Sequence, residues 1–235
     1  MEEYNQERQE DEDMKHCILG ITGGVGSGKS TVLDILEKDY GAYVIQADQV
    51  AHELMEPGQA SYQAIVEHFG QEILTEDGHI DRKALGTIVF ADQEKLTLLN
   101  SLTHPAVKTE ICRRILEQFT KAVLRERAEQ LSVTDISNSV FIVIEAALLL
   151  EDHYDQICDE IWYVFADREV RFQRLAESRG YSREKSQSMM EKQMSDEELR
   201  LRCQAVIDNS STLEETKAML AGILQERTSL SRENL

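Results

Sequence analysis

Residues 23–30 read G-G-V-G-S-G-K-S, which fits the pattern G-x-x-x-x-G-K-[S/T] of loops that bind polyphosphates. In such loops, glycines let backbone N–H groups turn inward around phosphate oxygens, while the lysine reaches the outer phosphates and the hydroxyl ligates Mg²⁺. The alternative is a glycine-rich structural turn. We predict a nucleotide-binding loop, with these residues at the nucleotide: Gly23, Gly24, Val25, Gly26, Ser27, Gly28, Lys29, Ser30 and Thr31.

The segments before and after this loop are predicted to have the secondary structure that the motif requires, a strand and a helix. Residues 17–22 form a short apolar run typical of a buried strand, and apolar residues from Val32 to Leu36 indicate the start of a helix. A strand–loop–helix order directs the helix N-terminus, with its partial positive charge, at the phosphates. We therefore expect Lys29 to act on the phosphates and Ser30 to bind the metal.

Asp48 follows a second predicted strand at residues 43–46. Ligands of open parallel sheets bind at the carboxyl ends of the strands, which is where this carboxylate would lie. A small-molecule kinase needs such a group to orient the acceptor hydroxyl beside the γ-phosphate. The alternative is a plain helix cap, because aspartate is a favoured capping residue. We predict that Asp48 is catalytic.

Further candidates lie at the end of another strand and in an arginine-rich segment. Glu145 ends the apolar run 140–144 and has the position of a carboxylate that holds a Mg²⁺-bound water; a surface acid is the alternative. Of the arginines in residues 168–183, Arg174 and Arg179 are the best candidates to neutralise the moving phosphoryl group. Arg168, Arg171 and Arg183 belong to the same cluster, and some of these arginines are expected on solvated faces.

The order of predicted elements indicates an α/β fold. Short apolar runs at 17–22, 43–46, 140–144, 161–165 and 205–207 alternate with helical segments, which predicts a parallel sheet covered on both faces. Residues 49–130 are mostly helical and too long for a simple crossover, so we expect an inserted substrate lobe. Within it, His104-Pro105 predicts a boundary before a long helix from about residue 106. Residues 168–193 read as two helices broken at Gly180, and 212–226 as a last helix.

Composition excludes several classes of function. The chain has 235 residues and a net charge of -19, which argues against nucleic-acid binding because that needs a basic face. No apolar stretch is long enough for a membrane helix. Four scattered cysteines without a C-x-x-C pattern predict reduced thiols in a cytoplasmic protein. Residues 1–13 carry seven acids and one arginine, typical of a disordered, solvated tail.

The phosphate loop alone does not separate kinases from nucleotide switches. A GTPase switch would show Asp-x-x-Gly and Asn-Lys-x-Asp, and neither occurs. Two alternatives stay open at this point: another small-molecule or nucleoside-monophosphate kinase, and a non-catalytic nucleotide-binding regulator. A regulator needs no acceptor-side base, so Asp48 distinguishes these classes.

Several motifs in order resemble the dephospho-CoA kinase family. They are G-I-T-G-G-V-G-S-G-K-S-T at 20–31, V-I-Q-A-D at 44–48 with A-H at 51–52, H-P at 104–105, and V-I-D-N at 206–209. The loop is generic, but the other motifs at these separations are specific, and the resemblance covers roughly residues 17–224. The chain departs from the family in having Gln46 before Ala-Asp, and Ala146-Ala147 where Val-Pro is usual.

The resemblance implies transfer of phosphate from ATP to the 3′-hydroxyl of dephospho-CoA, with Mg²⁺, Asp48 as general base and Asn209 near the ATP base. It implies one P-loop NTPase-type kinase domain over residues 14–235. Its core would hold residues 14–48, 139–167 and 204–228, with a helical CoA lobe at about 49–130 and a helical lid at about 168–193. We expect ATP and dephospho-CoA as the partners of a monomer or weak homo-oligomer.

Overall fold

The computed structural model describes residues 16–129 and 140–233, which divide into two compact units. One unit holds the described residues up to Val44 and those from Lys121 onward, and the second is Ile45–Thr120. The predicted acidic tail at 1–13 lies outside the described residues. In the described parts of the chain, no helix is long and apolar enough to cross a membrane.

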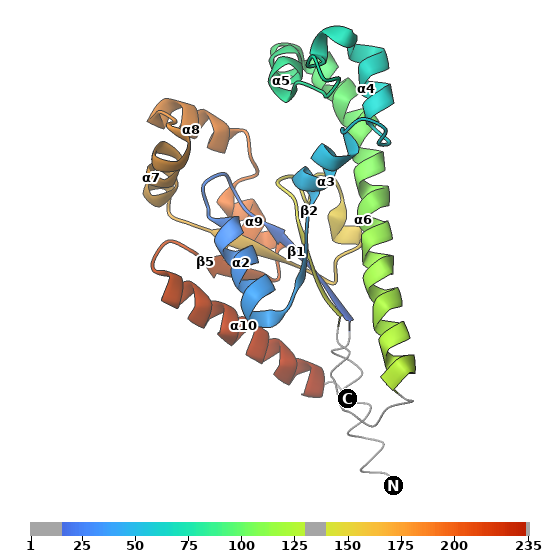
Figure 1. The fold of residues 1–235 in the computed structure, drawn as a ribbon. Helices are drawn as coiled ribbons and strands as arrows, with labels where there is room; N and C mark the ends of the chain where they lie inside the picture. The colour runs from blue at the N-terminus through green and yellow to red at the C-terminus, as the bar shows by residue number, and fades with distance from the viewer. Residues whose placement is uncertain (1–15, 130–139, 234–235) are drawn as a thin grey trace. The chain divides into compact units, whose positions relative to one another are not determined.

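In the described residues one sheet has five strands: β1 (His16–Thr22), β2 (Tyr43–Gln46), β3 (Val140–Glu145), β4 (Glu160–Phe165) and β5 (Ala205–Asp208). Their order in the sheet is β2-β3-β1-β4-β5 (Figure 1). The pairings of β1 with β3, β1 with β4 and β4 with β5 are parallel. The predicted parallel α/β sheet is thereby confirmed, and β1 with its following loop lies at its centre.

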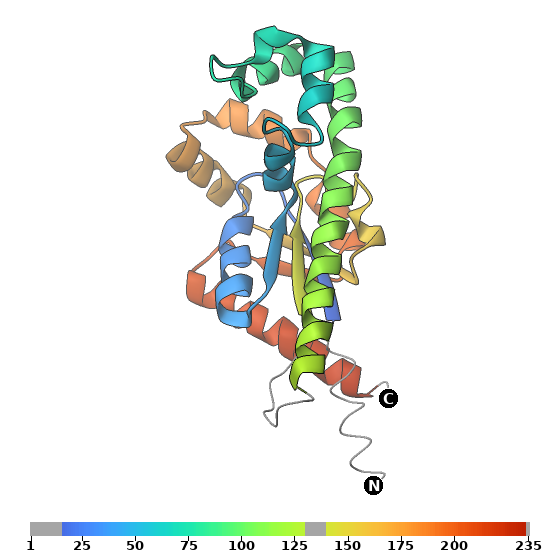
Figure 2. The same ribbon diagram turned by 45° about the vertical axis from the view of Figure 1, so that its right-hand side comes forward.

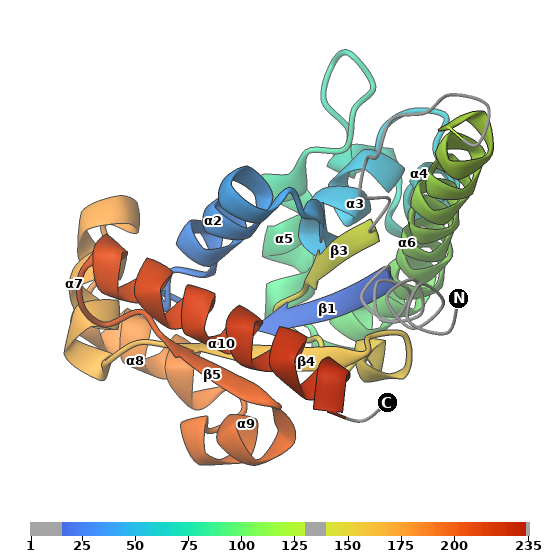
Figure 3. The same ribbon diagram turned by 90° about the horizontal axis from the view of Figure 1, so that it is seen from below.

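Both faces of this sheet are covered, as its continuous apolar strands require. Helices α2 (Lys29–Tyr40) and α10 (Leu213–Glu233) run along one face (Figure 3). There Leu19, Trp162 and Val164 pack with Leu36 and Leu220 in one buried cluster. On the other face, β4 is in contact with helix α9 (Asp196–Arg202). The short helix η2 (Tyr154–Gln156) follows β3.

The second unit is helical, as predicted for the inserted segment. It contains α3 (Ala47–Leu54), α4 (Tyr62–Phe69), the short η1 (Gln71–Ile73) and α5 (Arg82–Ala91). Its buried core includes Ile65, Ile73 and Leu85. The Asp81 side chain caps the N-terminus of α5 by accepting hydrogen bonds from the Lys83 and Ala84 N–H groups, so this helix start is encoded locally.

The predicted helix boundary at His104-Pro105 is wrong. Helix α6 (Gln93–Glu129) runs through Pro105 without a break (Figure 2). It begins earlier because the Asp92 side chain caps the N–H groups of Glu94 and Lys95, and because Leu99 and Leu102 pack against the core of the second unit. An interior proline costs about 3 kcal/mol, and capping together with this apolar packing offsets that cost.

Two helices follow β4, and the break between them lies where the sequence predicts it. Helix α7 (Arg168–Arg179) ends at Gly180, which has a φ of 63°, and α8 (Arg183–Glu191) begins after Ser182. Only glycine adopts this left-handed conformation without a steric penalty. The Ser182 hydroxyl accepts a hydrogen bond from the Lys185 N–H and caps α8. That this pair moves as a lid stays a prediction.

Candidate phosphate-binding site

The loop at residues 23–30 joins β1 to α2 and has the backbone shape of a phosphate cradle. Gly26 and Gly28 have φ angles of 78° and 82°, in the left-handed region that favours glycine. Gly28 is also the N-cap of α2, so the helix N-terminus opens directly onto the loop. The first helical residues are Lys29 and Ser30, and Ser30 is exposed. This arrangement directs partial positive charge at the mouth of the loop.

Lys29 and Glu145, two predicted site residues, are brought together at this end of the sheet. The Lys29 Nζ donates a 2.8 Å hydrogen bond to the Gly23 carbonyl and lies 3.7 Å from the Glu145 Oε1. Glu145 ends β3 and is only 8% exposed. The ammonium group is therefore held over the loop, between backbone and a carboxylate, instead of extending into solvent.

Asn209 and Arg174 donate hydrogen bonds to backbone carbonyls of the loop. The Asn209 Nδ2 donates to the Ser27 carbonyl at 2.9 Å and to the Gly28 carbonyl at 3.3 Å. Arg174, on α7, donates from Nη1 to the same Ser27 carbonyl at 3.2 Å and from Nη2 to the Asn209 carbonyl at 2.8 Å. The Asn209 Oδ1 accepts from the Thr216 hydroxyl of α10 at 3.0 Å. The loop, α7 and α10 are thus connected through one asparagine.

Three glycines of the loop leave no room for a side chain. A Cβ at Gly23 would lie 2.6 Å from the Val164 carbonyl oxygen, and one at Gly24 would lie 2.2 Å from the Arg171 Nη2. At Gly28 it would lie 2.3 Å from the Asn209 Nδ2. Close approach of other groups therefore explains these glycines, in addition to backbone conformation.

Arg179 and Asp48, two other predicted site residues, take no part in the hydrogen bonds and the ion pair just described. Arg179 is in the last turn of α7, and its guanidinium carbon is 6.0 Å from the centroid of the Tyr181 ring. Asp48 is an exposed residue in the first turn of α3, directly after β2, and belongs to the second unit. One helical turn later, burial and then Arg82 lower the pKa of His52, which favours the neutral imidazole.

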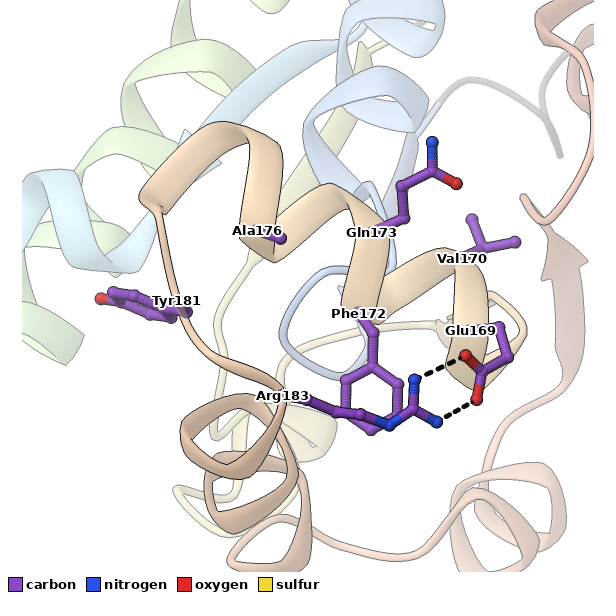
Figure 4. Close-up of a pocket in the computed structure, with 7 residues that line it drawn as sticks. All are labelled: Glu169, Val170, Phe172, Gln173, Ala176, Tyr181 and Arg183. Atoms are coloured by element: carbon purple, nitrogen blue, oxygen red, sulfur yellow. Dashed lines mark hydrogen bonds and ion pairs between the residues drawn. The ribbon is translucent and has the colours of Figure 1, made fainter.

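A hollow of about 440 Å³ lies beside α7 and α8. Within it the Arg183 guanidinium forms an ion pair with Glu169 and lies 4.2 Å from the centroid of the Phe172 ring (Figure 4). None of the residues that line it belongs to the phosphate loop, whereas a cavity of about 20 Å³ borders Gly23 and Gly24. Volume alone therefore does not identify the phosphate site; the loop geometry does.

Sequence reasoning missed two side chains that contact the loop. Arg171 is 6% exposed, and its Nε donates to the Val25 carbonyl at 2.9 Å. The Gln193 Oε1 accepts from the Val25 N–H, also at 2.9 Å. The spacing of Arg171 and Arg174 places both on one face of a helix, which was a usable signal. Nothing in the local pattern singles out Gln193, because its partner is far away in the sequence.

Comparisons with known proteins agree with the motifs. A family model for dephospho-CoA kinase matches residues 17–215. The dephospho-CoA kinase of Carboxydothermus hydrogenoformans is 40% identical, over 89% of this chain and 93% of the relative. That of Geobacter sulfurreducens is 41% identical, over 89% and 98%. A solved dephospho-CoA kinase from Campylobacter jejuni has a TM-score of 0.62 at 24% identity, over 94% and 100% of the two chains, which supports the fold.

Proposed function

The chain belongs to the dephospho-CoA kinase family, and we propose that it transfers the γ-phosphoryl group of ATP to the 3′-hydroxyl of dephospho-CoA. The observation that carries this proposal is the loop of residues 23–30, with Lys29 held at its rim and α2 beginning at its end. Both features serve a polyphosphate. The products are coenzyme A and ADP, in the last step of coenzyme A synthesis.

In this mechanism the loop amides and Lys29 hold the β- and γ-phosphates. The 3′-oxygen of the acceptor forms a bond to the γ-phosphorus while the bond from that phosphorus to the β–γ bridging oxygen breaks, and ADP leaves. Asp48 orients the hydroxyl and accepts its proton. An exposed carboxylate directly after a strand fits this role, because it is accessible to a substrate.

Mg²⁺ fits the donors at the loop. Ser30 is exposed at the start of α2, and the Glu145 carboxylate lies beside Lys29, so a hydroxyl and a carboxylate are available. The described residues contain no group of three His, Cys, Asp or Glu side chains for a metal, and Mg²⁺ with a nucleotide needs none because phosphates and waters fill its shell. When bound, the ion would offset phosphate charge.

Arg174, Arg179 and Asn209 complete the proposed site. Arg174 is placed to act beside the loop, since its guanidinium already contacts the Ser27 carbonyl. Arg179, at the far end of α7, would reach the phosphoryl group after a movement of the lid. Asn209 would lie near the ATP base while its amide holds the loop.

The proposed setting is the cytoplasm, with a monomer or weak homo-oligomer and no nucleic-acid partner. All four cysteines lie in the described residues and none forms a disulfide. Burial raises the pKa of the Cys158 thiol to about 12 and that of Cys203 to about 11, so both stay protonated and unreactive at neutral pH. The net charge of -19 opposes binding to nucleic acid.

Dephospho-CoA and a matched pair of its deoxy analogues test the proposal. Purified protein with ATP and Mg²⁺ is given dephospho-CoA, its 2′-deoxy analogue or its 3′-deoxy analogue, and ADP release and product mass are measured. We expect turnover with the first two and none with the 3′-deoxy compound. Lys29→Ala is the catalytic control and is expected to abolish transfer while the protein stays folded. Turnover of the 3′-deoxy analogue, or of none of the three, would refute the proposal.

A further inference from the structure

Three carbonyl groups of the phosphate loop are held by side chains from outside the loop. The Val25 carbonyl accepts a hydrogen bond from Arg171, and the Gly28 carbonyl accepts one from Asn209. The Ser27 carbonyl accepts from both Arg174 and Asn209. These donors come from α7 and from the segment after β5, far from the loop in the sequence. The backbone of the loop is therefore oriented by tertiary contacts as well as by its glycines.

The direction of each carbonyl fixes the direction of the next N–H group. In a trans peptide the C=O and the following N–H point in opposite directions, and the described residues contain no cis peptide bond. A carbonyl of Val25 that points at Arg171 therefore turns the N–H of Gly26 away from Arg171. The same geometry turns the N–H groups of Gly28 and Lys29 away from Asn209. Convergent N–H groups of this kind form an anion-binding concavity.

Arg171 is itself held in place by a second pair of side chains. Its Nη1 lies 3.5 Å from the Asp196 Oδ1 at the start of α9, and that oxygen accepts a 2.6 Å hydrogen bond from the Tyr163 hydroxyl of β4. Burial, and then the hydrogen bond to Asp196, raise the pKa of Tyr163, so the hydroxyl keeps its proton and remains the donor. The guanidinium is thus positioned by a residue of the central sheet, through Asp196.

Gln193 bonds to the other backbone group of Val25, its N–H. Its Oε1 accepts from the Val25 N–H, so both backbone groups of Val25 are bonded to side chains of the segment after β4. The Arg171 Nη2 lies so close to Gly24 that a Cβ there would approach it to 2.2 Å. The guanidinium therefore packs directly against loop backbone.

We propose that Arg171, oriented by Asp196 and Tyr163, is a positioning residue that holds the Val25 peptide so that the Gly26 N–H faces the phosphates. It acts through the Nε–H bond to the Val25 carbonyl, not through its charge on the phosphate. This inference rests on the proposed binding of ATP by the loop. Its test compares a variant that loses both the hydrogen-bond donor and the charge with one that loses only the charge.

Arg171→Met removes both donor and charge, whereas Arg171→Gln removes the charge but keeps an N–H that can reach a carbonyl. We expect Arg171→Met to raise the KM for ATP about ten-fold, the size of one lost charge-assisted hydrogen bond, with the KM for dephospho-CoA unchanged. In Arg171→Gln the KM for ATP is expected to return most of the way to the parent value. Arg202→Met, which removes a half-exposed charge on α9, is the matched control and is expected to leave both constants unchanged.

A spectroscopic readout reports the backbone itself. In ¹H–¹⁵N spectra titrated with ADP, the Gly26 amide proton is expected to move downfield in the parent protein and in Arg171→Gln, and to move less in Arg171→Met. Asp196→Ala provides a second route if Arg171→Met does not fold, since Asp196 is 42% exposed and its removal frees the guanidinium. It is expected to raise the KM for ATP about three-fold, a smaller loss because the Nε–H donor remains.

Equal impairment in Arg171→Met and Arg171→Gln would mean that the charge acts directly, and would overturn the proposal. Normal ATP constants and a normal Gly26 shift in Arg171→Met and Asp196→Ala would also overturn it. Failure of the proposed function is a different result, because the parent protein would then turn over the 3′-deoxy analogue or none of the three acceptors.

Discussion

The two glycines at the ends of α2 provide a matched test of how the loop is supported. Gly28 at the N-terminus has a φ of 82° and Gly41 at the C-terminus has a φ of 68°, so alanine is strained at both positions. Their surroundings differ. A Cβ at Gly28 would lie 2.3 Å from the Asn209 Nδ2, whereas a Cβ at Gly41 has no heavy atom within 4 Å.

The expected magnitudes follow from this difference. Left-handed alanine costs about 1–2 kcal/mol, part of which is offset by the lower entropy of the unfolded chain, so Gly41→Ala should lose about 1 kcal/mol. Gly28→Ala adds the loss of buried Asn209 hydrogen bonds, at about 1–3 kcal/mol, for a total of about 2–4 kcal/mol. At about 2–4 °C per kcal/mol, the Tm should fall by about 2–4 °C in the first variant and by about 4–16 °C in the second.

Urea unfolding and ATP kinetics at a temperature where both variants are folded distinguish these outcomes. Gly41→Ala is expected to keep the parent KM for ATP, because it leaves the loop untouched. Gly28→Ala is expected to raise that KM about ten-fold or more, because the N–H groups that it displaces are the ones proposed to bind the phosphates. Equal losses of stability in both variants, with an unchanged KM in Gly28→Ala, would show that Asn209 moves aside freely and that it does not hold the loop.

Three further predictions address other parts of the chain. Asp48→Asn should lower kcat by about 10²–10⁴ with little change in the KM for ATP; a collapse of ATP affinity at full kcat would make Asp48 a structural cap. A chain that starts at Met14 should keep its Tm and activity, because residues 1–13 have almost no apolar side chains to bury, and a loss of stability would show that they dock. Hydrogen exchange across residues 168–193 should slow when a non-hydrolysable ATP analogue and dephospho-CoA bind together; equal protection without ligands would rule out a mobile lid.

Local patterns predicted most of the fold because they depend on neighbouring residues. The strand–loop–helix at residues 17–36 and the break at Gly180 follow from apolar runs and from one left-handed position. Pro105 shows where such rules fail, since capping by Asp92 and packing of Leu99 carry the helix through a residue that usually ends one. The intrinsic helix propensity of a residue predicts structure only weakly when tertiary contacts oppose it.

The candidate site was predictable in the same uneven way. Lys29 and Glu145 could be placed near each other from sequence because Glu145 ends one parallel strand and the loop that leads to Lys29 follows another. Parallel strands have their carboxyl ends at one edge of a sheet. The contact of Arg171 with Val25 spans 146 positions and depends on where α7 docks. The Gln193 contact spans 168 positions. No periodicity encodes such contacts, so only the folded structure reveals them.

An acidic chain that binds a polyanion needs a local source of positive potential. Within a net charge of -19, Lys29 already lies beside Glu145, and Arg171 lies beside Asp196, so these cations are partly offset by their neighbours. Oriented N–H groups at the start of α2 supply potential without adding net charge, and their effect falls off within the first turn. What matters at this site is therefore the direction of a few peptide groups. The side chains that set this direction from behind the loop should affect ATP binding even where they contact no phosphate.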